Sequence, residues 1–251
     1  MAKNLTRPRD RWARWTALAT LGLACASCFS QAQTIEGEPD AHLAARVLGV
    51  EVHASDPEEV RYWILRKLTD RYAAEKGIEV TQGEIDAYLD GMARIAAEDR
   101  RQREARREEI EGRLATPGLG DADRKAVSSE LDSLDQLQQS LDDLSSGDSE
   151  DAEKTRQTRR TIAAAFIRQW KLNQALYQQY GGRIIVQQGG PEPLDAYRTF
   201  LGDEQRHGAF EFLDRSLEAA FWRYYLTDSM HSFYPPGSME ERQAFQTPWW
   251  Q

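Results

Sequence analysis

The stretch QQYGGRIIVQQGGPEPLDAYRTFL, Gln178 to Leu201, decides how the rest of the chain is interpreted. It places two glycine pairs around a short apolar run, in a chain whose other apolar patterns are mainly helical. Ile184-Ile185-Val186 is β-branched and favours a strand, and Gly181-Gly182 suits the left-handed residue that ends a helix. The stretch therefore predicts a helix end, a strand from Gly182 to Gln188, and a new helix with Pro191 in its first turn.

A phosphate-binding loop is the competing interpretation of the two glycine pairs. Neither pair fits the patterns G-x-x-x-x-G-K-[ST] or G-x-G-x-x-G. Glu192 and Asp195, expected in the first turn of the following helix, would favour the helix dipole but repel a phosphate. The glycines are therefore interpreted as turn residues, and no nucleotide cofactor is expected.

A single strand must satisfy its backbone hydrogen bonds by pairing with another segment. The other good candidate is Val47 to His53, where apolar side chains at Leu48, Val50 and Val52 alternate with others. We therefore predict that Val47–His53 pairs with Gly182–Gln188, which closes the helical segments into one domain.

Helix signals are clear in the segment that follows the first strand. Pro57 to Lys76 has a capping sequence before it, an apolar residue every four positions, and Gly77 after it. Thr81 and Glu84 have the spacing of a capping box, which predicts a second helix from there.

The segment from Glu98 to Leu144 is more charged than the rest of the chain. Its first half has few apolar residues, Thr116-Pro117-Gly118 interrupts it, and its second half has leucines spaced by three and four as in a coiled coil. We predict an antiparallel helical hairpin, with a partly disordered charged linker as the alternative.

The sequence predicts three regions after the signal peptide. They are residues 33–98 as N-terminal strand and core helices, 99–160 as hairpin insertion and linker, and 161–251 as C-terminal core helices, closing strand and aromatic tail.

Residues 1–32 have the pattern of a secretory signal peptide. Five basic residues precede the apolar run Thr16 to Phe29, and Ser30-Gln31-Ala32 offers small residues at a cleavage site. The apolar run is shorter than a membrane span requires. We expect export to the periplasm with cleavage after Ala32, and lipidation at Cys25 or Cys28 is the less favoured alternative.

Composition excludes several classes of partner and cofactor once residues 1–32 are removed. The remainder carries 27 Lys and Arg against 40 Asp and Glu, a net charge of −13, and no cysteine. Nucleic acids and anionic lipid surfaces require basic surfaces. Neither nucleic-acid binding nor membrane insertion is therefore expected, and thiol catalysis and Cys-ligated metals are excluded.

The sequence offers no recognisable catalytic or metal-binding constellation. His42, His53, His207 and His231 lack the spacing of metal ligands, and the motifs G-x-S-x-G and S-x-x-K do not occur. We expect no catalytic residue, no metal site and no cofactor.

The segment YAAEKGIEVTQGEIDAYL, Tyr72 to Leu89, resembles the SurA N-terminal chaperone family. The resemblance is clearest at Ala73, Gly77-Ile78, Val80-Thr81 and Glu84-Ile85, and its looser part covers Ala45 to Ile95. It implies a helical domain that binds unfolded or extended polypeptides in the bacterial cell envelope. The chain departs from the family's usual pattern because no parvulin isomerase segment is visible.

Aromatic and apolar side chains are the candidate peptide-binding residues under this resemblance. They are Trp63, Tyr72, Tyr88, Met92, Trp170, Phe221 and Trp222. Core packing is the competing interpretation for these side chains. For Trp249-Trp250, docking on the body and a partner site both stay open.

The sequence thus predicts an exported, mostly α-helical, ATP-independent chaperone-like protein with a SurA N-like domain. Its expected partners are unfolded or extended polypeptides, with outer-membrane proteins as candidate clients. One alternative is a non-catalytic assembly or structural partner of an envelope or secretion complex, for which the charged hairpin would be the docking arm. Another is a prolyl isomerase with an unrecognised site.

Overall fold

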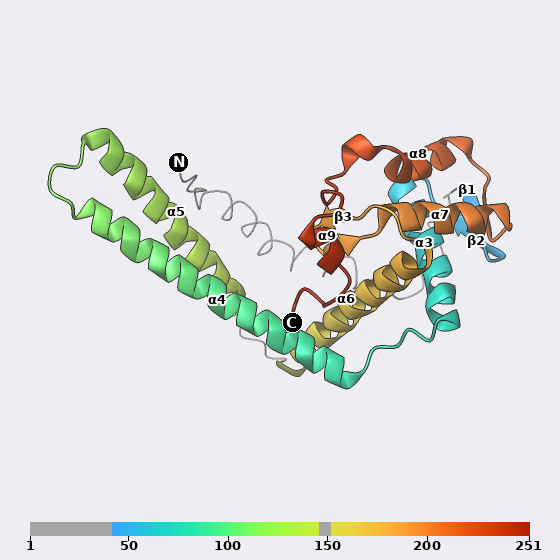
Figure 1. Ribbon diagram of the computed structural model, residues 1–251, viewed down its shortest axis with the longest axis horizontal. Coiled ribbons are helices and arrows are strands. Elements are labelled where there is room, and N and C mark those ends of the chain that lie inside the picture. Colours follow the sequence, from blue (N-terminus) through green and yellow to red (C-terminus); the bar gives the residue numbers. More distant parts are fainter. Residues whose placement is uncertain (1–41, 146–151) are drawn as a thin grey trace. The chain divides into compact units, whose positions relative to one another are not determined.

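The computed structural model describes residues 42–145 and 152–251, and the expected signal peptide lies outside them. Within these ranges the chain is mostly helical, with seven α-helices and two small antiparallel sheets (Figure 1). The predicted mostly α class is thereby confirmed. The described residues form two compact units: unit 1 comprises residues 42–80 and 166–249, and unit 2 comprises residues 81–165 and 250–251.

The larger sheet of unit 1 has three strands in the order β2-β1-β5. Strands β1 (Leu43–Val47) and β2 (Val50–His53) form a hairpin, and β5 (Phe210–Phe212) pairs with the other edge of β1. One face is apolar and buried, with Val47, Val52 and Phe210 each at most 5 % exposed, whereas Arg46 and Glu51 are exposed. This alternation is the period-2 pattern of a sheet covered on one face.

The predicted pairing of Val47–His53 with Gly182–Gln188 is wrong. The first segment instead turns back on itself at Leu48 and Gly49, whose φ angles are +50° and +78°. Positive φ at both central residues is the requirement of the tight hairpin turn whose twist matches the strands. A local hairpin also closes a far shorter loop than the predicted pairing, so it loses less chain entropy.

The second predicted strand also pairs locally. Strand β3 (Ile185–Gln187) forms a hairpin with β4 (Gly190–Glu192), and an isolated bridge joins Ile185 to Phe233. Pro191, which we expected in the first turn of a helix, is therefore in a strand. The cause is Pro193, which disfavours helical backbone at the residue before it, so helix α7 (Leu194–Arg206) begins only after Pro193.

Three helices pack on the strands of unit 1: α3 (Pro57–Glu75), α7 and α8 (Arg215–Leu226). The start of α3 is as predicted, with Asp56 as N-cap, Pro57 next and acidic residues in the first turn. Together with the part of α6 (Ala152–Tyr180) in unit 1, these helices surround one apolar core. Its largest fully buried side chains are Ile64, Leu68, Leu172, Leu176, Ile185, Phe200, Phe210, Phe221 and Tyr225. The short helices η1 (Asp228–Met230) and α9 (Met239–Gln243) follow α8.

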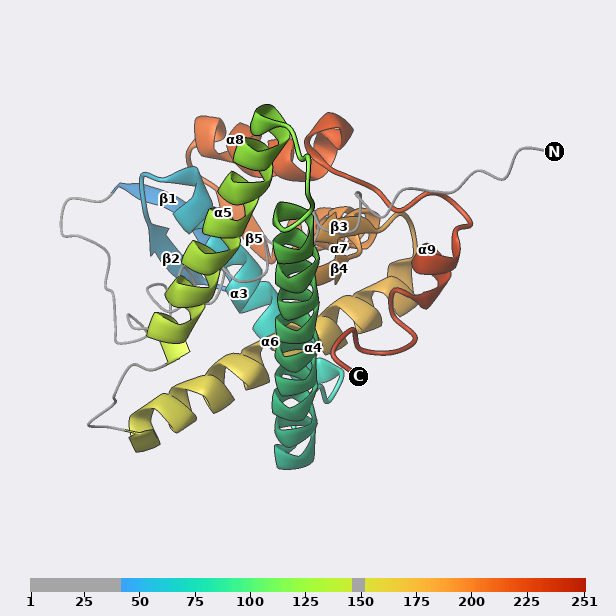
Figure 2. The same ribbon diagram turned by 90° about the vertical axis from the view of Figure 1, so that its left-hand side faces the viewer.

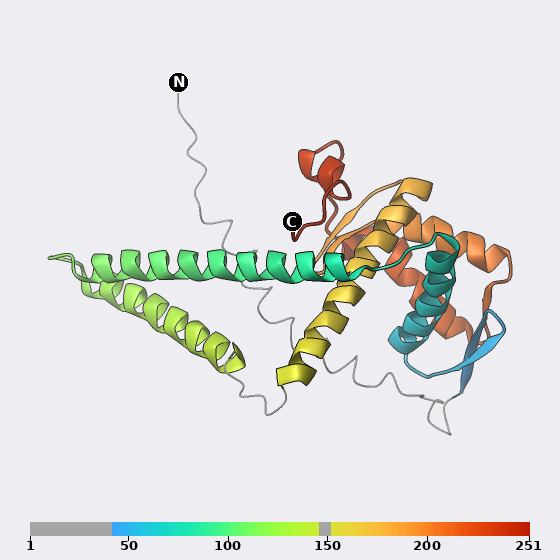
Figure 3. The same ribbon diagram turned by 90° about the horizontal axis from the view of Figure 1, so that it is seen from below.

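Unit 2 contains the predicted helical hairpin, α4 (Gln82–Leu114) and α5 (Asp121–Ser145) (Figures 2 and 3). The predicted capping box at Thr81 and Glu84 starts α4. Near the turn between the helices, Ile110 and Val127 are 0 % and 3 % exposed. Farther along, polar pairs link the helices, such as Arg106 Nε donating to Glu130 at 2.9 Å. The hairpin is therefore confirmed, and the alternative of a disordered linker does not apply to α4 and α5.

The expected boundaries after residues 98 and 160 fall inside helices α4 and α6. The division between units instead lies at Thr81, where the capping box starts α4, and near residue 165 within α6. The shift to charged sequence at Glu98 marks the point where α4 changes from an apolar to a polar surface. It does not mark the end of a structural element.

Within the two described ranges, no helix combines the length and the apolar character that a membrane span requires.

Candidate functional site

The structure divides the seven predicted peptide-binding residues between the two units. Trp63, Tyr72, Trp170, Phe221 and Trp222 lie in unit 1, whereas Tyr88 and Met92 lie on α4 in unit 2. Tyr72, Tyr88, Trp170 and Phe221 are between 1 % and 9 % exposed, and the other three are half-buried. The seven residues therefore do not line one surface within either unit.

Phe221 is at the centre of an aromatic cluster in the core of unit 1. Its ring centroid lies 5.2–5.9 Å from those of Phe210, Phe212, Trp222 and Tyr225. Aromatic rings at these separations stabilise a core beyond the area that they bury. Phe221 thus packs the core, and Trp222 lies at the edge of the same cluster.

Tyr72, Trp222 and Trp63 make further contacts within unit 1. The Tyr72 ring packs against Phe200 at 5.3 Å, and its hydroxyl donates to Gln179 at 3.0 Å. Trp222 Nε1 donates to Gln205 at 3.2 Å. The Trp63 ring lies edge-on to the exposed Tyr62, with the Arg66 guanidinium 5.5 Å from its centre. Of these three indole and phenol groups, only Trp63 and Trp222 retain partly accessible surface.

Tyr88, in contrast, faces a segment of the chain that has no regular secondary structure. The ring of Trp250 packs edge-on against Tyr88, with 5.0 Å between ring centroids, and Trp250 is 4 % exposed. Burial raises the pKa of Tyr88 to about 12, so its hydroxyl stays protonated at neutral pH. The docking alternative for Trp250 is thus confirmed, with Tyr88 and its neighbours on α4 as the docking surface.

Gly91, one turn along α4 from Tyr88, makes this docking possible. A Cβ atom at Gly91 would lie 2.0 Å from the backbone oxygen of Trp250. Any other residue would therefore displace the backbone of Trp250. We name this surface, formed by Tyr88 and Gly91 with the half-buried Met92 beside them, the α4 seat. Glycine destabilises a helix interior, so a mid-helix glycine near the apolar positions Tyr88 and Met92 is the sequence signal that could have indicated this surface.

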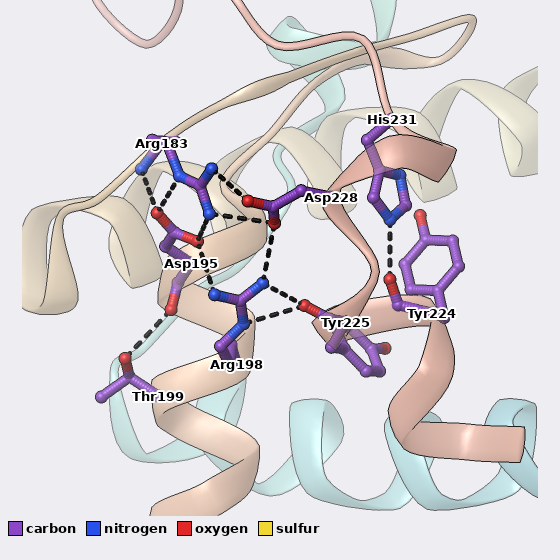
Figure 4. Close-up of polar contacts among 8 residues, drawn as sticks. All are labelled: Arg183, Asp195, Arg198, Thr199, Tyr224, Tyr225, Asp228 and His231. Carbon is purple, nitrogen blue, oxygen red and sulfur yellow. Dashed lines mark hydrogen bonds and ion pairs between the residues drawn. The ribbon is translucent and has the colours of Figure 1, made fainter. Parts of the chain in front are cut away.

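A second cluster, of ionic groups, joins three elements of unit 1 (Figure 4). Arg183 Nε donates to Asp195 Oδ2 at 2.8 Å, and its Nη1 donates to Asp228 Oδ2 at 2.6 Å. Arg198 reaches the same two carboxylates and also donates through Nε to the Tyr225 carbonyl at 2.8 Å. The cluster thus connects the segment before β3, the first turns of α7, the end of α8 and the start of η1.

Electrostatics support a structural role for this ionic cluster. Partial burial alone would raise the pKa of Asp195, but hydrogen bonds from the Arg183 side chain and backbone lower it overall. Hydrogen bonds from Arg183 and Arg198 outweigh a smaller effect of burial and lower the pKa of Asp228. The two guanidinium groups are thus matched by two carboxylates, and the cluster is an internal clamp.

Glu192 and Tyr224 form a third polar group beside this clamp. The Tyr224 hydroxyl donates to Glu192 at 3.2 Å, and Gln187 Nε2 donates to the same hydroxyl at 3.0 Å. Arg61 lies over the Tyr224 ring, 4.4 Å from its centroid. Burial raises the pKa of Glu192, although the Tyr224 hydrogen bond and the charges of His231 and Arg61 oppose the shift. Such a carboxyl group favours protonation more than an exposed one does.

Three of the four histidines in the described residues make separate side-chain contacts. His42 lies 3.1 Å from Asp214, His53 lies 3.4 Å from Glu51, and His231 Nε2 lies 2.6 Å from the Tyr224 carbonyl oxygen. In residues 42–145 and 152–251, no group of three or more His, Cys, Asp or Glu side chains is arranged to hold a metal ion.

No family model, curated protein or solved structure matches this chain. The resemblance to the SurA N-terminal family therefore stays a prediction.

Proposed function

We propose that this protein binds unfolded or extended polypeptides by apolar contacts, without ATP, as an exported chaperone-like protein of the cell envelope. Residues 1–32 would direct it to the periplasm and be removed there. The client would be a chain segment with large apolar or aromatic side chains, as found in outer-membrane proteins before they fold.

The observation that carries this proposal is the way α4 holds Trp250. An irregular segment of polypeptide lies there by ring packing on Tyr88 and by close approach of its backbone to Gly91. Two of the residues that the sequence nominated for peptide binding, Tyr88 and Met92, belong to this seat. The contacts need an apolar side chain and a backbone carbonyl, which any unfolded chain can supply.

The distribution of exposed apolar side chains supports further client contacts in unit 1. In the described residues, all the exposed large apolar side chains lie in that unit. They are Leu48, Val50, Tyr62, Val186, Leu213, Leu226, Met230 and Met239. Apolar contacts are weakened little by salt, unlike exposed ion pairs. Binding by these side chains would therefore tolerate high ionic strength.

An aggregation assay tests the proposal. We expect the purified protein, without ATP, to delay aggregation of a urea-unfolded outer-membrane protein, and to do so equally at low and at high salt. A variant that lacks Trp250 and Gln251, and so has an empty α4 seat, is assayed in parallel. If neither protein delays aggregation, the chaperone proposal is wrong.

The hairpin favours one alternative, an assembly partner that docks through α4 and α5. None of the exposed large apolar side chains lies on the described part of this hairpin, and its surface is charged. A partner there would be selected by charge complementarity. A pull-down from periplasm distinguishes the two functions: many unfolded proteins support the chaperone, and one stoichiometric, salt-sensitive partner supports assembly.

A further inference from the structure

We propose that the segment Thr247–Gln251 is an intramolecular competitor for the α4 seat, and that the ligand of the seat is an irregular peptide segment with a large aromatic residue. This inference rests on the proposed polypeptide binding and names its site, its ligand class and its regulation. Deleting Trp250 and Gln251 would free the seat for a peptide supplied from outside.

The contact at Gly91 is specific to one position on α4. The backbone oxygen of Trp250 lies where a Cβ atom of residue 91 would otherwise be, at a separation of 2.0 Å. Gly83 and Gly112 are on the same helix, and a Cβ atom at either would meet nothing within 4 Å. Of these three glycines, Gly91 is thus the one whose lack of a side chain lets a peptide backbone approach α4.

The seat also matches an aromatic side chain. Tyr88 presents its ring edge-on to the Trp250 ring at 5.0 Å, an arrangement that aromatic pairs prefer. Tyr88 is 6 % exposed with Trp250 in place. An empty seat would leave apolar surface of Tyr88 in water, so another aromatic residue could occupy it with a gain in burial.

The chain leading to Trp250 has anchors of its own, which do not depend on the Trp250 side chain. Phe245 is buried against Tyr177 with 5.1 Å between ring centroids, and Gln174 Nε2 donates to its carbonyl at 2.7 Å. Trp249 lies close to Gly190 of the β3–β4 hairpin. Trp250→Ala would leave the backbone of residue 250 over Gly91. Deletion of Trp250 and Gln251 instead empties the seat and keeps these earlier contacts.

The test measures binding of a labelled peptide with the sequence TPWWQ and capped ends, by fluorescence anisotropy. A tethered competitor acts at an effective concentration in the millimolar range, so it raises the apparent Kd of an external ligand. We expect the variant that lacks Trp250 and Gln251 to bind the peptide at least about tenfold more tightly than the unchanged protein.

Gly91→Ala distinguishes specific binding at the α4 seat from nonspecific binding of the peptide. This change also displaces Trp250, but its new Cβ atom blocks the backbone of any peptide in the same position. We therefore expect no gain in binding for Gly91→Ala, and loss of the gain when Gly91→Ala is combined with the deletion of Trp250 and Gln251. Gly83→Ala is the matched control on α4 and should bind like the unchanged protein. Circular dichroism checks that each variant keeps its helical content.

Three outcomes would overturn the inference. The competitor fails if the deletion variant binds the peptide no better than the unchanged protein, and the seat fails if Gly91→Ala gains as much as the deletion variant. A dimer of the unchanged protein that dissociates on the deletion would show that the segment fills the seat of a second copy. Peptide binding by the deletion variant together with a failed aggregation assay would keep the seat and reject the chaperone.

Discussion

The core of unit 1 and the α4–α5 hairpin of unit 2 are stabilised in different ways. Unit 1 joins segments far apart in sequence, as in the pairing of Ala45 with Phe212, and buries a continuous apolar core between strands and helices. The hairpin joins neighbouring helices, with Ile110 and Val127 buried and polar pairs such as Arg106–Glu130 along its length. Exposed ion pairs stabilise a protein by only about 0–1 kcal/mol each.

This difference predicts where substitutions should matter. A side chain in the core of unit 1 contacts several elements, so its loss affects the whole unit. A side chain in the hairpin contacts the facing helix and its own helix, so its loss should remain local. The fold of unit 1 also depends on long-range contacts, which form at a larger cost in chain entropy than those of a helical hairpin.

The largest expected effect comes from Phe221→Ala in unit 1. Phe221 is 1 % exposed and packs against four other aromatic rings, so its truncation should leave a cavity and cost about 3–5 kcal/mol. Urea unfolding followed by tryptophan fluorescence should show a lower midpoint, because four of the five tryptophans in the described residues belong to unit 1 and Trp250 alone belongs to unit 2.

Ile110→Ala in the hairpin is the matched comparison. It should cost about 2–4 kcal/mol of hairpin stability, visible in the far-ultraviolet circular dichroism, while the fluorescence midpoint changes little. Equal shifts of both signals in both variants would show that the two units unfold together, and the distinction between them would then be wrong.

The helices could be predicted from the sequence because their signals are local. The capping box at Thr81 and Glu84, Pro57 at the start of α3, and Gly77 and Gly181 with φ of +62° and +66° at helix ends are each decided by a few neighbouring residues. The leucine spacing of α5 likewise predicted its pairing with α4. For these elements the sequence pattern and the structure agree.

The strand pairing and the site could not be predicted in the same way. The pattern at Leu48 and Gly49 did not indicate a two-residue turn, because leucine rarely adopts a positive φ. Apolar periodicity marks a residue as facing inward, but it does not distinguish a core residue such as Phe221 from one that faces a bound segment, such as Tyr88. The role of Gly91 depends on Trp250, which is far away in the sequence.

An intermediate effect is expected from Gly182→Ala, next to the ionic clamp of unit 1. Gly182 has φ of +91°, and its Cβ atom would lie 2.4 Å from Cβ of Asp195. Backbone strain and this clash together should cost about 3 kcal/mol. Gly181→Ala is the control, because Gly181 also has a positive φ but nothing within 4 Å of its Cβ position, so about 1 kcal/mol is expected. Equal losses of melting temperature would contradict the close approach of Asp195.

The smallest expected effect is the pH dependence caused by Glu192. Burial raises the pKa of Glu192 in the folded protein above its unfolded value, which is about 4.3. The folded state therefore binds more protons between these two pKa values, and this contribution to stability is lost as pH rises through the folded pKa. Glu192→Gln removes the charge but keeps an oxygen that can accept the Tyr224 hydrogen bond. It should therefore be as stable as the unchanged protein at about pH 4, and more stable by less than about 1 kcal/mol at pH 7.

Asp195→Asn should show the opposite pH dependence of stability, because the pKa of Asp195 is shifted in the opposite direction. The pKa of Asp195 is lowered in the folded protein, so its ionic contribution is present above the unfolded pKa of about 3.9 and is lost as pH falls through the folded value. Asp195→Asn should therefore be less stable than the unchanged protein at pH 7, and the difference should shrink in acid. Urea unfolding of the three proteins between pH 3 and pH 8 measures both slopes. Glu192→Gln could instead lose stability at pH 7, as Asp195→Asn is expected to do. The ionised Glu192 carboxylate would then stabilise the fold as part of the clamp, and the inference that burial disfavours its ionised form would be wrong.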